Sequence, residues 1–429
     1  MTEATQGSPG ARGSTSELST TTFKRLHPRT YLERFLSAHI REDGRLFSSW
    51  RLTSCVMGSI ESAQGSCLVR MGITTVVAAV KAEITKPQTD MYASWSKNPI
   101  AKQRRINLLQ KRSAERMTPP PSIETEEQIK GEMAGWLLPN VEITPMSSGR
   151  GRPGPPTEEA QAITDRLTEM LASPTRPIID TNSLCIEPDV ASWCLYLDIS
   201  VICHDGNILD AALLAAVGAL MNSESQPQQH LHHSALTKHM PIPTARIPHA
   251  TYDETKQPSV RCQKPTPSSP GAPLRLLSLP LTFSFSVYEG THLLSDPSGF
   301  EGAFTSSSST SVHGSALVGL TQWTEEGKAW KQEWKELAAS MNEEGEEKAD
   351  DEMEEDADSD ESTREDLEAV AIQYLHTVGR CRAILPPDEQ KDAKLTGLLT
   401  PAQLTHNCIA KARRRYTELR TILEKASNV

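Results

Sequence analysis

Residues 193–220, WCLYLDISVICHDGNILDAALLAAVGAL, change their pattern once and so define two elements and the corner between them. The first part is rich in β-branched and aromatic side chains, which predicts a buried strand. The second part is rich in Ala and Leu, which predicts a helix over residues 207–222. Asp205-Gly206 is a turn dipeptide between them. The stretch therefore predicts a core strand that leads directly into a core helix.

Two carboxylates, Asp205 and Asp210, lie at this corner and allow two interpretations. They could form a catalytic acid pair. Alternatively, Asn207 with an acid three residues later fits a capping box, in which the two side chains satisfy backbone N–H groups at the start of a helix. On residue types alone we favour the capping interpretation.

The rest of the chain extends the same alternation of strands and helices. The pattern predicts three strands within 49–85, a strand pair over 279–297 and a further strand near 308–322. Helices are predicted near 29–40, from Glu158 onward, and over 400–426. The order strands, helix, strand, helix, strands, helix predicts an α+β domain with βαβ crossovers.

Composition predicts one compact unit with interruptions. Only 37% of the 429 residues are hydrophobic, 29 are Pro, and the polar residues come in blocks. We expect a core over 23–322 that is interrupted by unfolded insertions. The predicted divisions are a disordered tail at 1–22, a basic insertion at 90–133, a low-complexity insertion at 223–273, an acidic disordered tract at 339–366, and a C-terminal helical part at 367–429.

Charge is concentrated in two of these segments. Residues 343–366 hold 15 Asp/Glu and 2 Lys/Arg, a local charge of −13 that leaves +2 for the rest of the chain. Residues 97–117 hold seven Lys/Arg against one Glu and are followed by TPPPS, which predicts a basic helix ended by prolines. That helix could contact RNA or an acidic protein, or it could be a solvated surface helix.

No motif for metal, cofactor or nucleophilic chemistry stands out. The eight cysteines form no C-x-x-C pair, and the histidines at 230–239 have no acidic or Cys partners, so we expect neither a metal site nor a cofactor. Phosphate-loop, G-x-S-x-G and H-E-x-x-H motifs are absent, and we assign no catalytic residue. Without an apolar leader or an 18-residue apolar run, we expect a soluble, intracellular protein with no membrane contact.

The loop SSGRGRPGPP is the best candidate for contact with nucleic acid. A Gly/Pro-rich backbone can hold the guanidinium groups of Arg150 and Arg152 out toward phosphates. The same composition also describes an ordinary surface loop.

Several stretches resemble the RNase PH-like family, in particular the ring subunits of the eukaryotic RNA exosome. The resemblance covers roughly 30–89, 137–222, 276–322 and 395–426, and it includes the elements R-x-DGR, GPP-x-EEAQ and DGN-x-LDA. It implies an RNase PH-like fold, with a ribosomal protein S5 domain 2-type βαβ core and a C-terminal helical part. It also implies a hetero-hexameric ring of RNase PH-like subunits, cap subunits bound to that ring, single-stranded RNA, and a location in nucleus, nucleolus and cytoplasm.

The resemblance also bears on activity. Phosphorolytic members carry a Gly-Gly-Thr-Arg-like run where the strand meets the helix, and small residues there let helix N–H groups hold phosphate. The matching residues here are Gly206, Asn207, Ile208 and Leu209. Active members also carry an acid pair after the LLSD-type strand. Asp296 and Glu301 remain here, but Gly302 and a Ser/Thr run fill the next acidic positions.

The expected function is therefore a non-catalytic, RNA-guiding ring subunit. It would support 3′-to-5′ processing and degradation of rRNA, mRNA and other RNAs by partner nucleases. The alternative is an active phosphate-dependent 3′-to-5′ exoribonuclease. Contacts between subunits are expected to involve the sheets and the helical region at 202–222.

Overall fold

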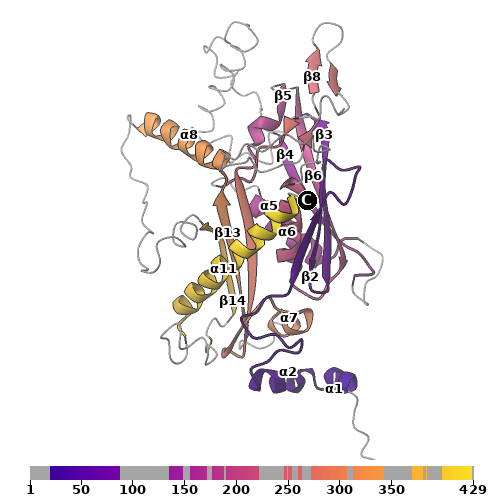
Figure 1. Cartoon of the computed structure of the whole chain (residues 1–429), viewed down its shortest axis with the longest axis vertical. Coiled ribbons are helices and arrows are strands. Elements are labelled where there is room, and N and C mark those ends of the chain that lie inside the picture. The colour runs from indigo at the N-terminus through magenta and orange to yellow at the C-terminus, as the bar shows by residue number, and fades with distance from the viewer. Residues whose placement is uncertain are drawn as a thin grey trace, which may run out of the picture.

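The computed structural model in Figure 1 describes most of the predicted core. The residues described are 20–86, 135–147, 155–171, 176–187, 190–221, 246–248, 250–253, 259–262, 272–306, 313–342, 370–379, 383 and 399–427. The predicted basic helix at 97–117 lies outside them, as do Arg150 and Arg152. The predictions made for those residues are not addressed by the structure.

The first sheet contains the strand predicted in the opening stretch. Its strand order is β1-β2-β3-β6-β4, with a short strand, β5, also paired to β6. The strands are β1 (Thr53–Met57), β2 (Gly65–Met71), β3 (Thr74–Thr85), β4 (Trp136–Ile143), β5 (Cys185–Glu187) and β6 (Ala191–Cys203). Every pairing is antiparallel except that of β4 with β6. The helix α5 (Glu158–Leu171) connects these two parallel strands, which confirms a βαβ crossover.

The second sheet is antiparallel throughout, in the order β12-β11-β13-β14. Its strands are β11 (Ser278–Tyr288), β12 (His292–Ser295), β13 (Gly314–Trp323) and β14 (Val370–Gly379). The predicted strand pair and the predicted strand near 308–322 are confirmed. The α+β class is confirmed as well.

Helix α6 (Ile208–Met221) lies between the two sheets (Figure 1) and packs on β2 and β3 of one and β11 of the other. All of its residues are buried, because a helix that is apolar on every side must be covered on every side. A Cβ at Gly218 would lie 2.5 Å from the Cys67 Sγ atom of β2. Glycine at this position therefore allows the helix to approach the sheet closely. A single hydrophobic core spans both sheets around it.

Helix α11 (Pro401–Ser427) contacts β1, an edge strand of the first sheet, and β11 and β13, the two central strands of the second sheet. Its Tyr416 is fully buried and donates a hydrogen bond of 2.7 Å to the backbone carbonyl oxygen of Leu279 in β11. Helices α1 (Thr20–Leu26) and α2 (Pro28–Ser37) lie at the lower end of the molecule in Figure 1. The buried face of α2 forms a second small core with residues of the second sheet and the segment before β1.

Four of the predicted divisions contain structure that we did not expect. Residues 20–22 belong to α1 rather than to a disordered tail, because ring contacts of Phe23 with Tyr31 hold α1 against α2. Residues 339–342 end the helix α8 (Glu325–Asn342) rather than begin the acidic tract. The low-complexity insertion contains four short strands that pair in twos: β7 (Arg246–Ile247), β8 (Ala250–Asp253), β9 (Ser259–Cys262) and β10 (Ala272–Pro273).

The predicted C-terminal helical part, 367–429, contains a strand in addition to helix α11. Residues 370–379, VAIQYLHTVG, form β14, because their β-branched and aromatic side chains suit a strand and β13 offers an edge for it. Strand β4 was not predicted, because its internal Pro139 argues against a strand. The strand tolerates Pro139 because β4 is the edge strand of the first sheet. The helices α7 (Gly299–Ser306) and α8 and the short 3-10 helix Thr181–Leu184 were not predicted either.

Burial of α6 corrects the prediction about subunit contacts. The helix cannot contribute a surface to a partner, because every residue in 208–221 is already buried within the chain. The sheets are the remaining part of that prediction. None of the described helices is both long enough and apolar enough to cross a membrane.

Candidate functional site at the strand-to-helix corner

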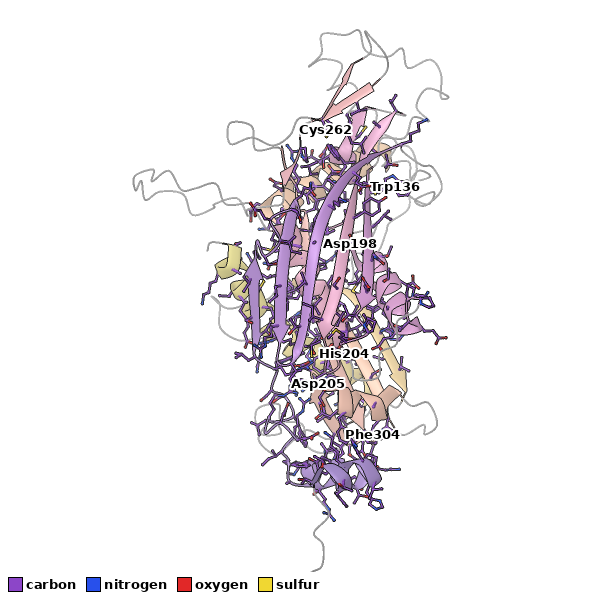
Figure 2. The ribbon with its side chains drawn as sticks, turned by 90° about the vertical axis from the view of Figure 1, so that its right-hand side faces the viewer. Trp136, Asp198, His204, Asp205, Cys262 and Phe304 are labelled. Carbon is purple, nitrogen blue, oxygen red and sulfur yellow. The ribbon has the colours of Figure 1, made fainter. Side chains whose placement is uncertain are left out.

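The corner between β6 and α6 is a tight turn that a second segment covers. Gly206 and Asn207 both have positive φ, 73° and 53°. A Cβ at Gly206 would lie 2.5 Å from the backbone nitrogen of Gly299, the first residue of α7. That nitrogen donates a hydrogen bond of 2.9 Å to the carbonyl oxygen of Asp205. The chain thus covers its own corner, and Figure 2 shows Asp205 at that end of the first sheet.

Asp296, directly after β12, provides a negative charge at this corner. Its carboxylate accepts hydrogen bonds from the Arg51 guanidinium at 2.7 and 2.9 Å and from the Arg51 backbone N–H at 3.0 Å. The side-chain amide of Asn207 donates another at 2.7 Å. The Asp296 side chain is completely buried and that of Arg51 is 7% exposed. This is a buried ion pair in which further hydrogen bonds satisfy the carboxylate.

The pKa shifts show that this pair stays charged. Burial alone would raise the pKa of Asp296, but the hydrogen bonds and charge of Arg51, together with Asn207, lower it below its ordinary value. Burial likewise opposes the charge of Arg51, but Asp296 outweighs it and raises the pKa of Arg51. The corner therefore holds a matched positive and negative charge at neutral pH.

Arg51 also binds the turn itself. Its Nη1 atom donates to the carbonyl oxygen of Asp205 at 2.9 Å and to the Thr74 hydroxyl at 3.3 Å. The same hydroxyl accepts the backbone N–H of Asp205 at 3.0 Å. The Arg51 side chain therefore connects the segment before β1 with the start of β3 and the strand-to-helix turn.

A second buried pair lies beside the first. Arg41 is fully buried and binds the Glu301 carboxylate through Nε, at 2.9 Å, and through Nη2. Its Nη1 atom also donates to the carbonyl oxygen of Ser295 at 2.6 Å. Asp296 and Glu301 are the two acids that the resemblance placed near the chemistry. Both are bound to arginines.

The predicted capping box is not formed. The carboxylate of Asp210 instead accepts the backbone N–H of Ser284 at 2.8 Å and the Ser284 hydroxyl at 3.0 Å, and the Asn207 side-chain oxygen is buried without a hydrogen bond. Ser284 lies one residue beyond the last pair between β11 and β12, so its N–H is available to α6. Burial raises the pKa of Asp210 to about 6.

The catalytic-pair interpretation gains no support from these contacts. Asp205 accepts the N–H of Gly299 at 3.2 Å, whereas Asp210 is directed to β11. Ile208 and Leu209, which the family resemblance aligned with a Thr and an Arg, are 4% and 7% exposed and belong to the core. Within the described residues, no group of three or more His, Cys, Asp or Glu side chains could hold a metal ion.

The roles of the arginines at this corner were not predicted from the sequence. The motif R-x-DGR, Arg41 to Arg45, was noted as an element of the family resemblance, but its cations were given no partner, and Arg51 was given no role. A signal was present, because a carboxylate placed directly after a core strand is expected to need a buried cation. The identity of that cation, some 245 residues away in sequence, could not be derived from local patterns.

The fold and site define an α+β domain in which a buried helix separates two sheets and an Arg–Asp pair closes its N-terminal corner. Residues 49–226 match the 3′ exoribonuclease family, domain 1, known as RNase PH. This part of the chain is similar to that family's first domain, which agrees with the family resemblance.

Similar proteins are exosome components. The exosome complex component rrp43 of Schizosaccharomyces pombe is 28% identical over 275 residues, which cover 64% of this chain and 76% of that protein. The exosome complex component Rrp42 of Saccharolobus solfataricus is 31% identical over 185 residues. These residues cover 43% of this chain and 52% of that protein, so the chain spans about half the length of this archaeal relative.

Two solved structures of archaeal exosomes are also similar to this chain. The Archaeoglobus fulgidus exosome with RNA bound to the active site has 20% identity and a TM-score of 0.44, covering 74% of this chain and 96% of that chain. An archaeal exosome core has 18% identity and a TM-score of 0.43, and the match covers 91% of this chain and 96% of that chain.

Proposed function

We propose that this chain is a ring subunit of an RNA exosome. The match to the RNase PH family and the similarity to rrp43 over 64% of the chain support this role. Its partners would be the other RNase PH-like subunits of a hetero-hexameric ring, the cap subunits and single-stranded RNA. It would act in processing and degradation of rRNA, mRNA and other RNAs, in nucleus, nucleolus and cytoplasm.

We infer further that the subunit is not itself catalytic, and one observation carries this inference. The Asp296 carboxylate, bound by Arg51 and Asn207, occupies the corner at which the family resemblance would place phosphate. An incoming phosphate would meet the buried apolar side chains of Ile208 and Leu209, and the nearby cations of Arg41 and Arg51 are already paired with Glu301 and Asp296. Because a buried charge without a partner is costly, these arginines will not readily release their carboxylates to bind a substrate.

An assay with and without phosphate tests the absence of catalysis. The purified chain, alone and together with each other RNase PH-like subunit of its organism, is incubated with 3′-labelled single-stranded RNA. We expect no release of nucleoside diphosphates in any combination. Phosphate-dependent release that is lost in Asp205→Asn would establish the active exoribonuclease instead. Asp205→Asn suits this purpose because Asp205 is part-exposed, whereas Asp296→Ala would also disturb folding.

Arg150 and Arg152 remain our proposed RNA contacts. Each phosphate that a cation neutralises steepens the salt dependence of RNA binding, so the assembled complex carrying Arg150→Ala and Arg152→Ala should bind RNA less tightly. Its slope of log affinity against log salt should fall by about 1–2. Arg166→Ala, at an exposed arginine of α5, is the matched control. Equal slopes in the two variants would remove Arg150 and Arg152 from the RNA path.

A further inference from the structure

Among the residues that the structure describes, no helix or strand covers one face of the first sheet. Side chains alternate along its strands, so that one set packs on α6 and the other points outward. Figure 2 looks onto the outward face, where Asp198 is labelled on β6 and no helix lies in front. Asp198 is exposed, as are Tyr196 and Ile202 on the same face of β6.

Several exposed or half-buried apolar side chains lie on this face, toward the end of the sheet that holds the β2–β3 turn and the end of β6. Val56, Leu68 and Val77 lie directly opposite one another on β1, β2 and β3. Val56 is 55% exposed, and the other two are half-buried. Ile202 at the end of β6 is 48% exposed, and Ile73 in the β2–β3 turn is 61% exposed. The row of Ser54, Arg70 and Thr75 lies between the Val56 row and the turn that holds Ile73, so the exposed face mixes apolar and polar side chains. Exposed apolar side chains set among polar ones are typical of a surface that contacts another protein.

The charges on the same face argue against RNA as that molecule. Its cations are Arg70, which also donates to the carbonyl oxygen of Gly72, and Lys81, which pairs with Glu83 at 3.4 Å. Its carboxylates are those of Glu83, Asp198 and Glu142. The face therefore has more negative than positive groups, whereas nucleic-acid surfaces need unpaired cations to neutralise phosphates.

We infer that the outer face of the first sheet is the contact surface for another folded subunit of the assembly. This inference rests on the proposed function and adds the chemistry of the partner. The partner presents apolar side chains to Val56, Val77 and Ile202, and a basic group to Asp198 and Glu142. Two copies of this face would bring an excess of carboxylates together, so charge favours a different chain over a second copy.

The face is smaller than the area that one partner buries in a standard interface. Five strands about 4.8 Å apart and about seven residues long give a flat area on the order of 500 Å². Each partner in a standard protein interface buries about 800 Å². The partner must therefore also cover the rim, where Leu52 is 88% exposed in addition to Ile73.

Charged substitutions on the face test the inference. The full chain is co-expressed with the other RNase PH-like subunits of its organism, and assembly is measured by native mass spectrometry and by titration calorimetry of the purified pair. Val56→Lys and Ile202→Lys should each weaken pairing at least tenfold, and Asp198→Lys should weaken it by repelling the basic partner. Ile372→Lys, at a residue of β14 that is 42% exposed, is the matched control and should change affinity less than twofold. Circular dichroism should show the same folded content in all variants.

The possible results separate this inference from the proposed function. If the wild-type chain enters no complex with those subunits, the exosome role and the inference both fail. If it assembles, but Val56→Lys and Ile202→Lys assemble as well as Ile372→Lys does, only the inference fails. A homodimer of the isolated chain that Val56→Lys dissociates, or RNA binding that the same variant abolishes, would replace the proposed partner by a second copy or by RNA.

Discussion

The corner at Asp205–Asn207 and the outer face of the first sheet lie on the same sheet but differ in how their groups are satisfied. At the corner, the buried charged groups Arg41, Arg51, Asp296 and Glu301 all have a partner within the chain. On the outer face, by contrast, apolar side chains such as Val56 and Ile202 remain exposed. The acids that resemble catalytic machinery are thus bound to arginines of the same chain, whereas the apolar side chains of the outer face are exposed.

The largest effect is expected when the negative charge at the corner is removed. Asp296→Ala leaves the buried Arg51 guanidinium without its counter-charge, which should lower the free energy of unfolding by about 3–5 kcal/mol. Urea unfolding followed by circular dichroism measures this change. Asp296→Asn, which keeps the shape and some hydrogen bonds, should cost less than Asp296→Ala.

The same variant tests whether the corner is closed. If Asp296→Ala were as stable as the wild type, Arg51 would have another partner or access to solvent, and the corner would be open to a ligand. A folded Asp296→Ala chain that binds phosphate would show directly that the carboxylate occupies an anion position. Either result would show that the charged groups at the corner are not satisfied within the chain, and the corner would then no longer differ from the outer face of the sheet.

The next largest effect is expected from adding a methyl group at the turn. Gly206→Ala would place a Cβ 2.5 Å from the Gly299 nitrogen on a backbone with φ of 73°, and should cost about 2–3 kcal/mol. Gly44→Ala is the matched control, because Gly44 has φ of 81° but no atom within 4 Å of its Cβ position. Thermal unfolding of both variants separates the clash from the backbone strain. Equal costs would show that α7 does not press on the corner.

Much of this fold could be predicted from residue patterns, because its central elements have strong local signals. The change from WCLYLDISVIC to LDAALLAAVGAL fixes β6 and α6 within a few residues. Strand β4 was missed because Pro139 normally excludes a strand, and only the position at a sheet edge removes that objection. Strand β14 was missed because it pairs with β13 from across a long acidic segment.

The corner was less predictable than the fold, since its bonds connect distant parts of the chain. Asn207 and Asp210 match a capping box by spacing, yet Asp296 and Ser284 take those side chains. Local rules assume that no tertiary partner competes for the same groups. At this corner, Asp296 after β12 and Ser284 in β11 form the hydrogen bonds that a capping box would otherwise use.

A smaller, pH-dependent effect is expected at Asp210. Its pKa is raised to about 6, so the folded state binds a proton that the unfolded chain releases near its ordinary value of about 3.9. The contribution of Asp210 to stability should therefore fall as pH rises from about 4 to about 6, by about 1–3 kcal/mol in all. The lowered pKa of Asp296 acts below this range, since its contribution is lost only on acidification under about pH 4.

Asp210→Asn isolates this contribution, because its side chain can still accept the N–H of Ser284 but cannot titrate. The difference in unfolding free energy between the wild type and this variant, measured by urea titration at several pH values, should be largest near pH 4 and constant above about pH 7. A difference that does not change with pH would show that Asp210 is charged throughout and better solvated than its burial implies.

The smallest effect is expected on the open face, where the same kind of disruptive change should hardly affect folding. Val56→Lys places a charge on a side chain that is already 55% exposed, so the free energy of unfolding of the isolated chain should change by less than about 0.5 kcal/mol. Val76→Lys, on the inner face of β3 and completely buried, should prevent folding or cost several times more. The difference in unfolding free energy between these two variants measures how much more the inner face of the sheet contributes to folding than the outer face. If Val56→Lys were strongly destabilising in the isolated chain, its effect on assembly could not be assigned to a partner, and the outer face would have to be covered by the chain itself.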